Sequence, residues 1–325
     1  MRLLASFGLL LILPLILAGC GSPPASSPVS ESAARVTQPP ALPTATPTPS
    51  PTATPSPIPT ATPTTTPTPT ITPTATPTPG PTPDGQIRTV RVPILMYHYI
   101  AIPPADADDY RRELSLDPAI FVQHLDYLQQ QGYTTMRLED LISYLQRGVP
   151  ELPPKPIILT FDDGYRDNYD NAFPALAGHG MIGTFFIITD FADLAATDPN
   201  YARYATWDQL RDMDAAGMEI GSHSRNHPDL RGKDVDFLVW QALGSSQTIA
   251  ANLGKKPRVL AYPFGSYDQQ VIDVFHSAGF WGAVTTQPGV EQRTDQVFEL
   301  KRLRISSKTG VAELAALLQY WENQP

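Results

Sequence analysis

A long segment rich in proline and threonine most restricts what this chain of 325 residues can fold into. From Pro39 to Pro83 it repeats Thr-Pro and Ala-Thr-Pro units, with no charge and almost no large apolar side chain. Such a segment cannot bury enough apolar surface to offset the entropy lost on ordering. Proline also holds the preceding residue extended, so we expect a disordered, semi-rigid stalk of about 3.1 Å per residue. The remaining residues 86–325 are enough for one α/β domain.

The first twenty residues are typical of an export signal. Arg2 precedes an apolar run that ends at Leu17 and is too short to span a membrane comfortably. The Leu-Ala-Gly sequence before Cys20 resembles the lipobox of bacterial lipoproteins, in which the signal is cleaved before a lipidated cysteine. We expect a signal peptide at residues 1–20, a linker at residues 21–85, and lipid anchoring through Cys20 on the extracytoplasmic face of the cell membrane. An ordinary signal would instead leave the chain's single cysteine unpaired.

The charge of the predicted domain limits its partners. The few charged residues outside it cancel, so the net charge of −9 falls on residues 86–325. An acidic surface argues against nucleic acid as a partner and disfavours strongly anionic polymers, whereas neutral glycans remain compatible. We expect a monomer that contacts a glycan and, through the lipid, the membrane.

Short β-branched runs alternate with amphipathic segments, as in parallel strands joined by helices. We predict eight strands, a number typical of a barrel, at residues 92–99, 133–137, 156–161, 183–189, 218–222, 258–262, 280–286 and 300–306. We predict helices at residues 118–131, 138–147, 169–179, 207–216, 235–253 and 268–278. Thr206 and Gln209 have capping-box spacing, and glycines follow most of the helices.

Two adjacent carboxylates, Asp162 and Asp163, follow the predicted strand that ends at Phe161. In barrels the carboxyl ends of the strands form the catalytic face. Neighbouring buried aspartates repel each other unless a cation holds one of them. Asp-Asp-Gly is also ordinary turn chemistry, so this pair alone leaves both interpretations open.

Two histidines follow the predicted strand at residues 218–222. His223 and His227 lie in the segment Gly221–Pro228, and their spacing lets both imidazoles converge on one ion. Two histidines and one carboxylate make a three-ligand site with an open position, as in catalytic metal centres. Two unrelated surface histidines are the alternative.

A third segment, Val259–Asp268, runs from a strand into a loop with proline, glycine and three aromatic residues. Such a loop can present backbone N–H groups and an aromatic wall to a sugar. The candidate substrate-binding residues are Tyr262, Pro263 and Tyr267. A plain turn with core aromatics is the alternative.

Thr160–Gly164 (Thr-Phe-Asp-Asp-Gly) together with Ser222–Pro228 (Ser-His-Ser-Arg-Asn-His-Pro) resembles the polysaccharide deacetylase family, carbohydrate esterase family 4. The resemblance implies a distorted (β/α) barrel of about seven or eight strands, with Asp162 as general base. It also implies that the backbone amide of Phe264 completes an oxyanion hole. The implied ligands of one divalent metal ion, usually zinc with cobalt or nickel as alternatives, are Asp163, His223 and His227.

The chain departs from the family pattern in two places. Ala261 stands where the family usually has an arginine that orients the base, and no histidine follows His276, so the usual C-terminal catalytic histidine is missing. His98, at the end of the first long strand, resembles the acid histidine of a circularly permuted branch that includes poly-N-acetylglucosamine deacetylases. A core histidine bonded to a backbone carbonyl is the alternative. Arg302 or Arg304 could replace the missing arginine.

The resemblance implies hydrolysis of acetyl groups from an N-acetylated glycan, most simply one containing N-acetylglucosamine, with release of acetate. His98 would protonate the leaving amine, and Asp162 would accept a proton from water. O-acetyl esters, as on xylan, would suit the same residues, and a non-catalytic glycan-binding module is a further alternative. A two-carboxylate glycosidase is disfavoured because adjacent aspartates rarely flank a bond from opposite sides.

Overall fold

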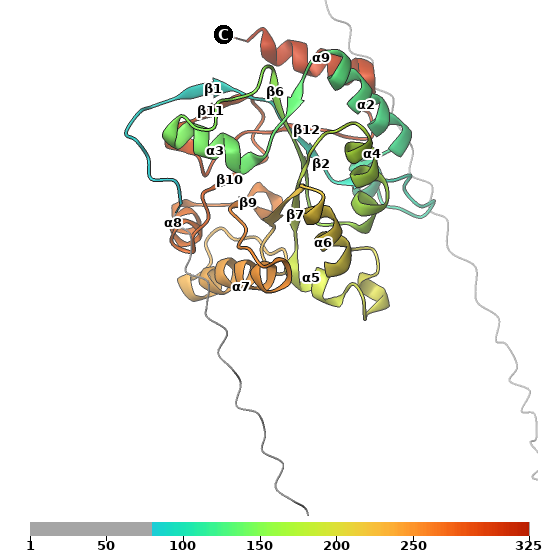
Figure 1. The fold of residues 1–325 in the computed structure, drawn as a ribbon. Coiled ribbons are helices and arrows are strands. Elements are labelled where there is room, and N and C mark those ends of the chain that lie inside the picture. The colour runs from blue at the N-terminus through green and yellow to red at the C-terminus, as the bar shows by residue number, and fades with distance from the viewer. Residues whose placement is uncertain (1–79, 325) are drawn as a thin grey trace, which may run out of the picture. The chain divides into compact units, whose positions relative to one another are not determined.

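The computed structural model describes residues 80–324, which build an α/β fold around one curled parallel sheet (Figure 1). Seven strands follow in the order β10-β9-β8-β7-β6-β2-β12, and β5 pairs with β6 outside this path. Every pair in the sheet is parallel. The strands are β2 (Ile94–Tyr97), β5 (Thr134–Thr135), β6 (Pro156–Phe161), β7 (Thr184–Ile187), β8 (Glu219–Ser222), β9 (Val259–Ala261), β10 (Gly282–Val284) and β12 (Leu303–Arg304). The predicted distorted barrel of seven or eight strands is confirmed.

The strands are buried on both faces, as parallel strands covered by helices must be. Along β6, Leu159 and Phe161 pack into one hydrophobic cluster while Ile158 packs into a second one. Leu95 on β2 belongs to the first cluster and Ile94 to the second. The alternation of side chains in a strand therefore supplies both cores, which is why these runs are apolar throughout.

Helices surround the sheet (Figure 1). They are α1 (Asp109–Glu113), α2 (Pro118–Gln130), α3 (Leu138–Arg147), α4 (Phe173–Gly178), α5 (Thr189–Leu194), α6 (Trp207–Ala215), α7 (Val235–Leu253), α8 (Gln269–Ser277) and α9 (Val311–Glu322). The Thr206–Gln209 capping box is present, and Gly148 and Gly254 end α3 and α7 in the left-handed conformation. Within residues 80–324, no helix has the length and apolar character needed to cross a membrane.

The last strand links the two edges of the sheet. β12 pairs with β2, and Leu300, three residues before β12, forms a parallel bridge to Val284 on β10. Arg302 lies between these two contacts, and its N–H donates to the carbonyl of Gln287. The segment that ends in β12 therefore runs beside both β10 and β2. Arg302, in the middle of this segment, lies in the interior of the fold.

Smaller elements complete the described chain. β1 (Thr89–Arg91) pairs antiparallel with β11 (Glu291–Arg293), and β3 (Tyr99–Ile100) pairs with β4 (Ser115–Leu116). Ahead of β1, Pro81 is already buried. The predicted signal peptide, its Cys20 and most of the predicted linker lie outside the described residues.

Candidate functional site

The carboxyl ends of the strands surround a cavity of about 390 Å³. Asp162 and Asp163 follow β6, His223 follows β8, and His98 lies between β2 and β3. Since parallel strands end on the same side of a sheet, segments far apart in the sequence meet here. Of the predicted site residues, the cavity is lined by His98, Asp162, Asp163, His223, His227, Tyr262 and Phe264.

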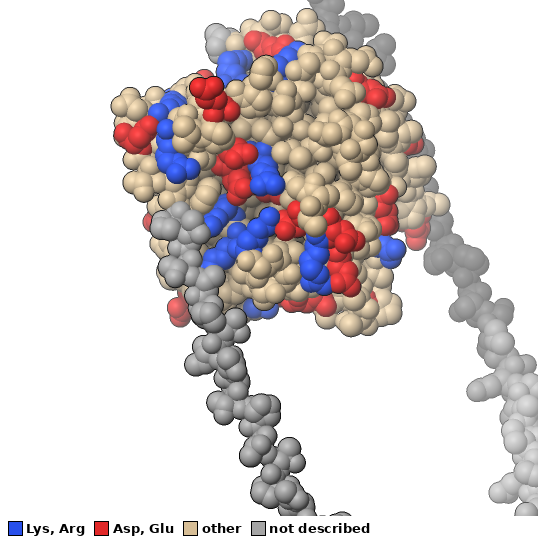
Figure 2. Space-filling view, in the orientation of Figure 1, with Lys and Arg blue, Asp and Glu red and all other residues tan. Residues whose placement is uncertain are grey.

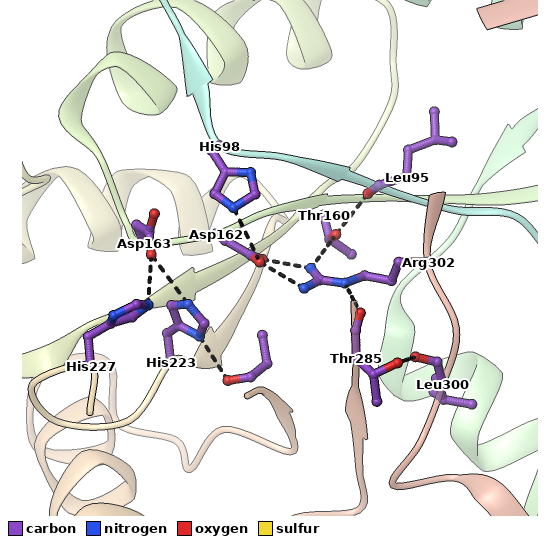
Figure 3. Close-up of polar contacts among 11 residues, drawn as sticks. Leu95, His98, Thr160, Asp162, Asp163, His223, His227, Thr285, Leu300 and Arg302 are labelled. Carbon is purple, nitrogen blue, oxygen red and sulfur yellow. Dashed lines mark hydrogen bonds and ion pairs between the residues drawn. The ribbon is translucent and has the colours of Figure 1, made fainter. Parts of the chain in front are cut away.

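The three predicted metal ligands converge. Asp163 Oδ1 lies 3.3 Å from His223 Nε2 and 3.4 Å from His227 Nε2 (Figure 3). The candidate ligand atoms of the three residues all lie within 4.8 Å of one another. Asp163 and His223 are buried, and His227 is partly buried. Among residues 80–324, these three form the group whose side chains could share one ion.

Hydrogen bonding prepares His223 for a ligand role. Its Nδ1 donates to the carbonyl of Ala261 at 2.8 Å, which leaves the Nε2 lone pair facing Asp163. Burial lowers the pKa of His223, but Asp163, Asp162 and the carbonyl of Ala261 together raise it, and the net direction is upward. Burial and the charge of His223 lower the pKa of His227 to about 4. Two imidazole nitrogens and one carboxylate oxygen thus face one another, and this donor set fits a zinc-class metal.

Asp162 is held by a fully buried arginine. Arg302 forms two parallel bonds to its carboxylate, Nη1 to Oδ1 at 2.7 Å and Nη2 to Oδ2 at 2.8 Å. Arg302 also donates to the carbonyl of Thr285 and to the hydroxyl of Thr160. Burial raises the pKa of Asp162, but the guanidinium lowers it further, and the net direction is downward. Figure 3 shows Asp162 between Arg302 and the Asp163–His223–His227 group. Arg302 thus occupies the role expected of an arginine at Ala261, while Arg304 lines the cavity.

His98 faces the same carboxylate from another side. Its Nε2 lies 4.0 Å from Asp162 Oδ2. Its Nδ1 is buried and has no hydrogen-bond partner within the described chain. A core histidine would need such a partner, so the structure favours a role in the cavity. Burial lowers the pKa of His98, and the carboxylates of Asp162 and Asp163 oppose this effect.

The third motif reaches the cavity only in part. Tyr262 lines it, with its hydroxyl donating to the carbonyl of Phe298, and the Phe264 ring lies against His227 with centroids 4.5 Å apart. Phe264 has a φ of 59°, and a side chain at Gly265 would collide with Thr286 at 2.1 Å. The tight turn therefore depends on Gly265. Pro263 is buried, and Tyr267 stacks on Tyr262 and donates to Glu299. Neither of these two predicted substrate-binding residues lines the cavity.

Several aromatic residues that the sequence analysis did not indicate also line the cavity. They are Tyr110, Tyr165, Phe191 and Tyr204. Tyr165 stacks between Tyr99 and Tyr204, with centroids 3.6 Å and 5.3 Å away. Tyr165 directly follows the Asp-Asp-Gly motif, a position that could have indicated it. Phe191 lies in the short helix α5, which the sequence pattern did not predict, and Tyr204 lies outside the named helices and strands, where no periodicity marks it.

Comparison with known protein families supports the interpretation of this cavity as a functional site. Residues 150–283 match the model of the family described as polysaccharide deacetylase. Residues 150–283 form a polysaccharide deacetylase domain. This domain makes the chain a hydrolase of the deacetylase class.

Relatives of this deacetylase extend the similarity over most of the described chain. The protein YxkH of Bacillus subtilis is 27% identical over 71% of this chain and 77% of its own length. A poly-β-1,6-N-acetyl-D-glucosamine N-deacetylase of Staphylococcus epidermidis is 24% identical over 62% of this chain and 70% of its own. The solved structure of the deacetylase PplD of Streptococcus pyogenes, in complex with acetate, is 26% identical. It aligns with a TM-score of 0.63 over 73% of this chain and 100% of PplD.

Proposed function

We propose that this deacetylase removes acetyl groups from an N-acetylglucosamine-containing polysaccharide by metal-dependent hydrolysis in the cavity at the strand ends. The single observation that carries the proposal is the division of two adjacent carboxylates between two tasks. Asp162 is bound to Arg302, whereas Asp163 points to His223 and His227. The name of the Staphylococcus epidermidis relative supports N-acetylglucosamine as the acetylated sugar.

The residues that would hold the ion are Asp163, His223 and His227. A bound divalent ion of the zinc class supplies a Lewis acid toward a carbonyl oxygen and toward water. Zinc, cobalt and nickel suit two imidazoles and one carboxylate better than magnesium or calcium does.

Asp162 and His98 would move the protons. Arg302 keeps Asp162 ionised, so its carboxylate can accept a proton as water attacks the acetyl carbon. His98 lies 4.0 Å from that carboxylate, so a small movement or one bridging water lets a proton pass between them. The amine leaves with the proton that His98 donates, and the products are acetate and a free amino sugar.

The test is acetate release by the full protein from acetylated β-1,4- and β-1,6-linked glucosamine oligomers, with acetylated xylan as the O-acetyl substrate. Chelation should stop the release, and zinc should restore it. Asp162→Asn should lose about 10²–10⁴-fold in rate, because proton transfer by a positioned side chain is worth this much. Asp236→Asn, at an exposed position of α7, is the control and should keep the parental rate.

Each result decides part of the proposal. Acetate release from xylan alone would correct the bond type to an ester. Release that persists with chelator present, or in Asp162→Asn, would contradict the proposed machinery. Shortening of the polymer without acetate would contradict the reaction itself.

A further inference from the structure

The loop that carries His223 and His227, here called the histidine loop (residues 223–227), has a strained backbone. Ser224 has a φ of 64° and His227 a φ of 60°. Residues other than glycine seldom adopt this left-handed region, and they persist there only when surrounding contacts hold them. His223 and His227 can converge on one ion only while the loop between them keeps this shape.

Helix α7 presents a polar and small-residue face toward this loop. Gln241, Gly244 and Ser245 stand at positions i, i+3 and i+4, which share one side of a helix. Gln241 and Ser245 are completely buried, next to the apolar Leu238 and Ala242. Buried polar groups in a helix need partners. Gln241 has its partners in the histidine loop, and Ser245 binds Ser222 at the end of β8.

Both ends of the Gln241 amide bind residues between the two histidines. Its Oε1 accepts the backbone N–H of Arg225 at 2.9 Å. Its Nε2 donates to Asn226 Oδ1 at 2.8 Å. A single fully buried side chain therefore fixes two of the three residues that separate His223 from His227.

The other two residues of this face fit the same loop. A Cβ at Gly244 would lie 2.5 Å from Cδ of Arg225, so the Arg225 side chain lies directly against the helix at this point. The guanidinium of Arg225 is in turn paired with Asp190 on α5. Ser245 Oγ accepts from Ser222 Oγ at 2.8 Å, and Ser222 Oγ accepts the N–H of Ser224.

We propose that Gln241 is a positioning residue that holds the histidine loop in its metal-binding shape before the ion arrives. Gly244 acts with it by allowing close contact. This inference rests on the proposed metal site. It predicts that metal affinity depends on a helix that supplies no ligand.

The experiment compares zinc affinity of the parent and of Gln241→Met, measured by competition with a chromophoric chelator. Methionine has a similar length but neither accepts from Arg225 nor donates to Asn226. We expect zinc to bind about 10–100-fold more weakly, the usual effect of removing a group that orients a ligand. The visible absorption spectrum of the cobalt form should also change, because the ligand geometry relaxes. Gln247→Met, on the exposed side of α7, is the matched control and should bind zinc like the parent.

Two further variants separate positioning from general stability. Gln241→Glu keeps the acceptor for Arg225 but not the donor to Asn226, so its affinity should fall between parent and Gln241→Met. Gly244→Ala should also weaken zinc binding, although alanine favours a helix interior over glycine. A folded Gln241→Met with parental zinc affinity and cobalt spectrum would overturn the inference, even if its melting temperature were lower. If Gln241→Met does not fold, parental affinity in Gly244→Ala would overturn it. A parent that binds no zinc would overturn the proposed metal site, and this inference with it.

Discussion

Asp162 and Asp163 show how two neighbouring carboxylates can both be buried. Asp163 has a φ of 73°, and its carboxylate reaches His223 and His227. Asp162 keeps both of its oxygens on Arg302. Arg302 gives Asp162 a positively charged partner, and a divalent ion held with the two imidazoles would do the same for Asp163, so that their mutual repulsion would be offset. The positive φ at the second aspartate is the local cause of the division between base and ligand.

From the sequence, the arginine that binds Asp162 could be narrowed only to Arg302 or Arg304. Arg302 and Arg304 lie two residues apart, so the alternation of a strand places them on the same side. They differ in depth: Arg302 is fully buried beside Thr160, whereas Arg304 is exposed. Depth along a barrel depends on strand register, and the sequence does not fix register.

The role of His98 predicts an effect that depends on the leaving group. His98→Ala removes the proposed proton donor but leaves the metal ligands and Asp162 in place. Hydrolysis of an N-acetyl glycan should slow by about 10²–10⁴-fold, because an amine is a poor leaving group without a proton. An activated aryl acetate, whose leaving group needs no proton, should be hydrolysed much closer to the parental rate. Initial rates on both substrates, with metal content and circular dichroism as controls, measure this difference.

A purely structural His98 would give another pattern. The variant would then be less stable, and both substrates would suffer alike. Equal losses on the two substrates, or near-parental amide hydrolysis in a folded variant, would remove His98 as the acid.

At the scale of elements, the predictions were best where a helix or strand carries its own end signals. Strand β6 and helices α3 and α7 have the predicted bounds. Each of these helices ends at a glycine in the left-handed conformation, and such a residue is readable in sequence. β6 is bounded by proline before it and by the Asp-Asp-Gly turn after it.

The predictions failed where tertiary contacts decide the structure. The expected single helix at 169–179 begins as a π-helical turn at Asn168–Ala172 and becomes α4 only at Phe173. Pro174 lacks an N–H and cannot make the normal helical bond to the preceding turn, which explains the wider turn. Helices α5 and α9 were not predicted. α9 packs against α2, and the spacing of its buried Leu314 and Leu318 was an available signal.

One buried carboxylate connects two elements and predicts a pH effect on stability. Glu219 on β8 accepts the backbone N–H groups of Leu138 and Glu139, and so caps α3, whose own N-cap residue makes no side-chain bond. Burial and the nearby Glu139 raise the pKa of Glu219 to about 7 from its ordinary 4.5. The folded protein thus binds this proton more tightly than the unfolded chain does. The resulting stabilisation is present at low pH and is lost as the pH rises through about 7.

The free energy of unfolding in urea tests this effect. The Gln side chain of Glu219→Gln cannot titrate. Relative to this variant, the free energy of unfolding of the parent should fall by about 1–3 kcal/mol between about pH 5 and about pH 8. Glu151→Gln, at an exposed position, should track the parent across the same range. A parent-to-Glu219→Gln difference that stays constant with pH would show that Glu219 keeps its ordinary pKa.

At the scale of the whole molecule, charge sets the kind of polymer that the domain can meet. The net charge is −9, and Figure 2 shows acidic and basic groups next to one another on this face rather than in separate fields. Several acidic and basic side chains of the described chain form ion pairs, including Arg293 with Asp295 and Arg225 with Asp190. Such a surface offers little attraction to a polyanion, whereas a neutral acetylated glycan can approach it without a charge penalty.

The last prediction concerns where the protein resides, and it rests on Cys20 and the proline-rich stalk, outside the described residues. We propose that Cys20 is lipidated and that the stalk separates the domain from the membrane. The intact protein should then sediment with membranes and resist high-salt washing, because acyl chains bind through apolar burial rather than charge. Cys20→Ser removes the sulfur that would carry the lipid, so this variant should appear in the soluble or secreted fraction. A shortened chain that begins at Gln86 should be soluble with unchanged activity on short oligomers, since the cavity lies wholly within the domain. Immunoblots of washed membranes measure all three, and a Cys20→Ser protein that stays membrane-bound after the salt wash would point to a different anchor.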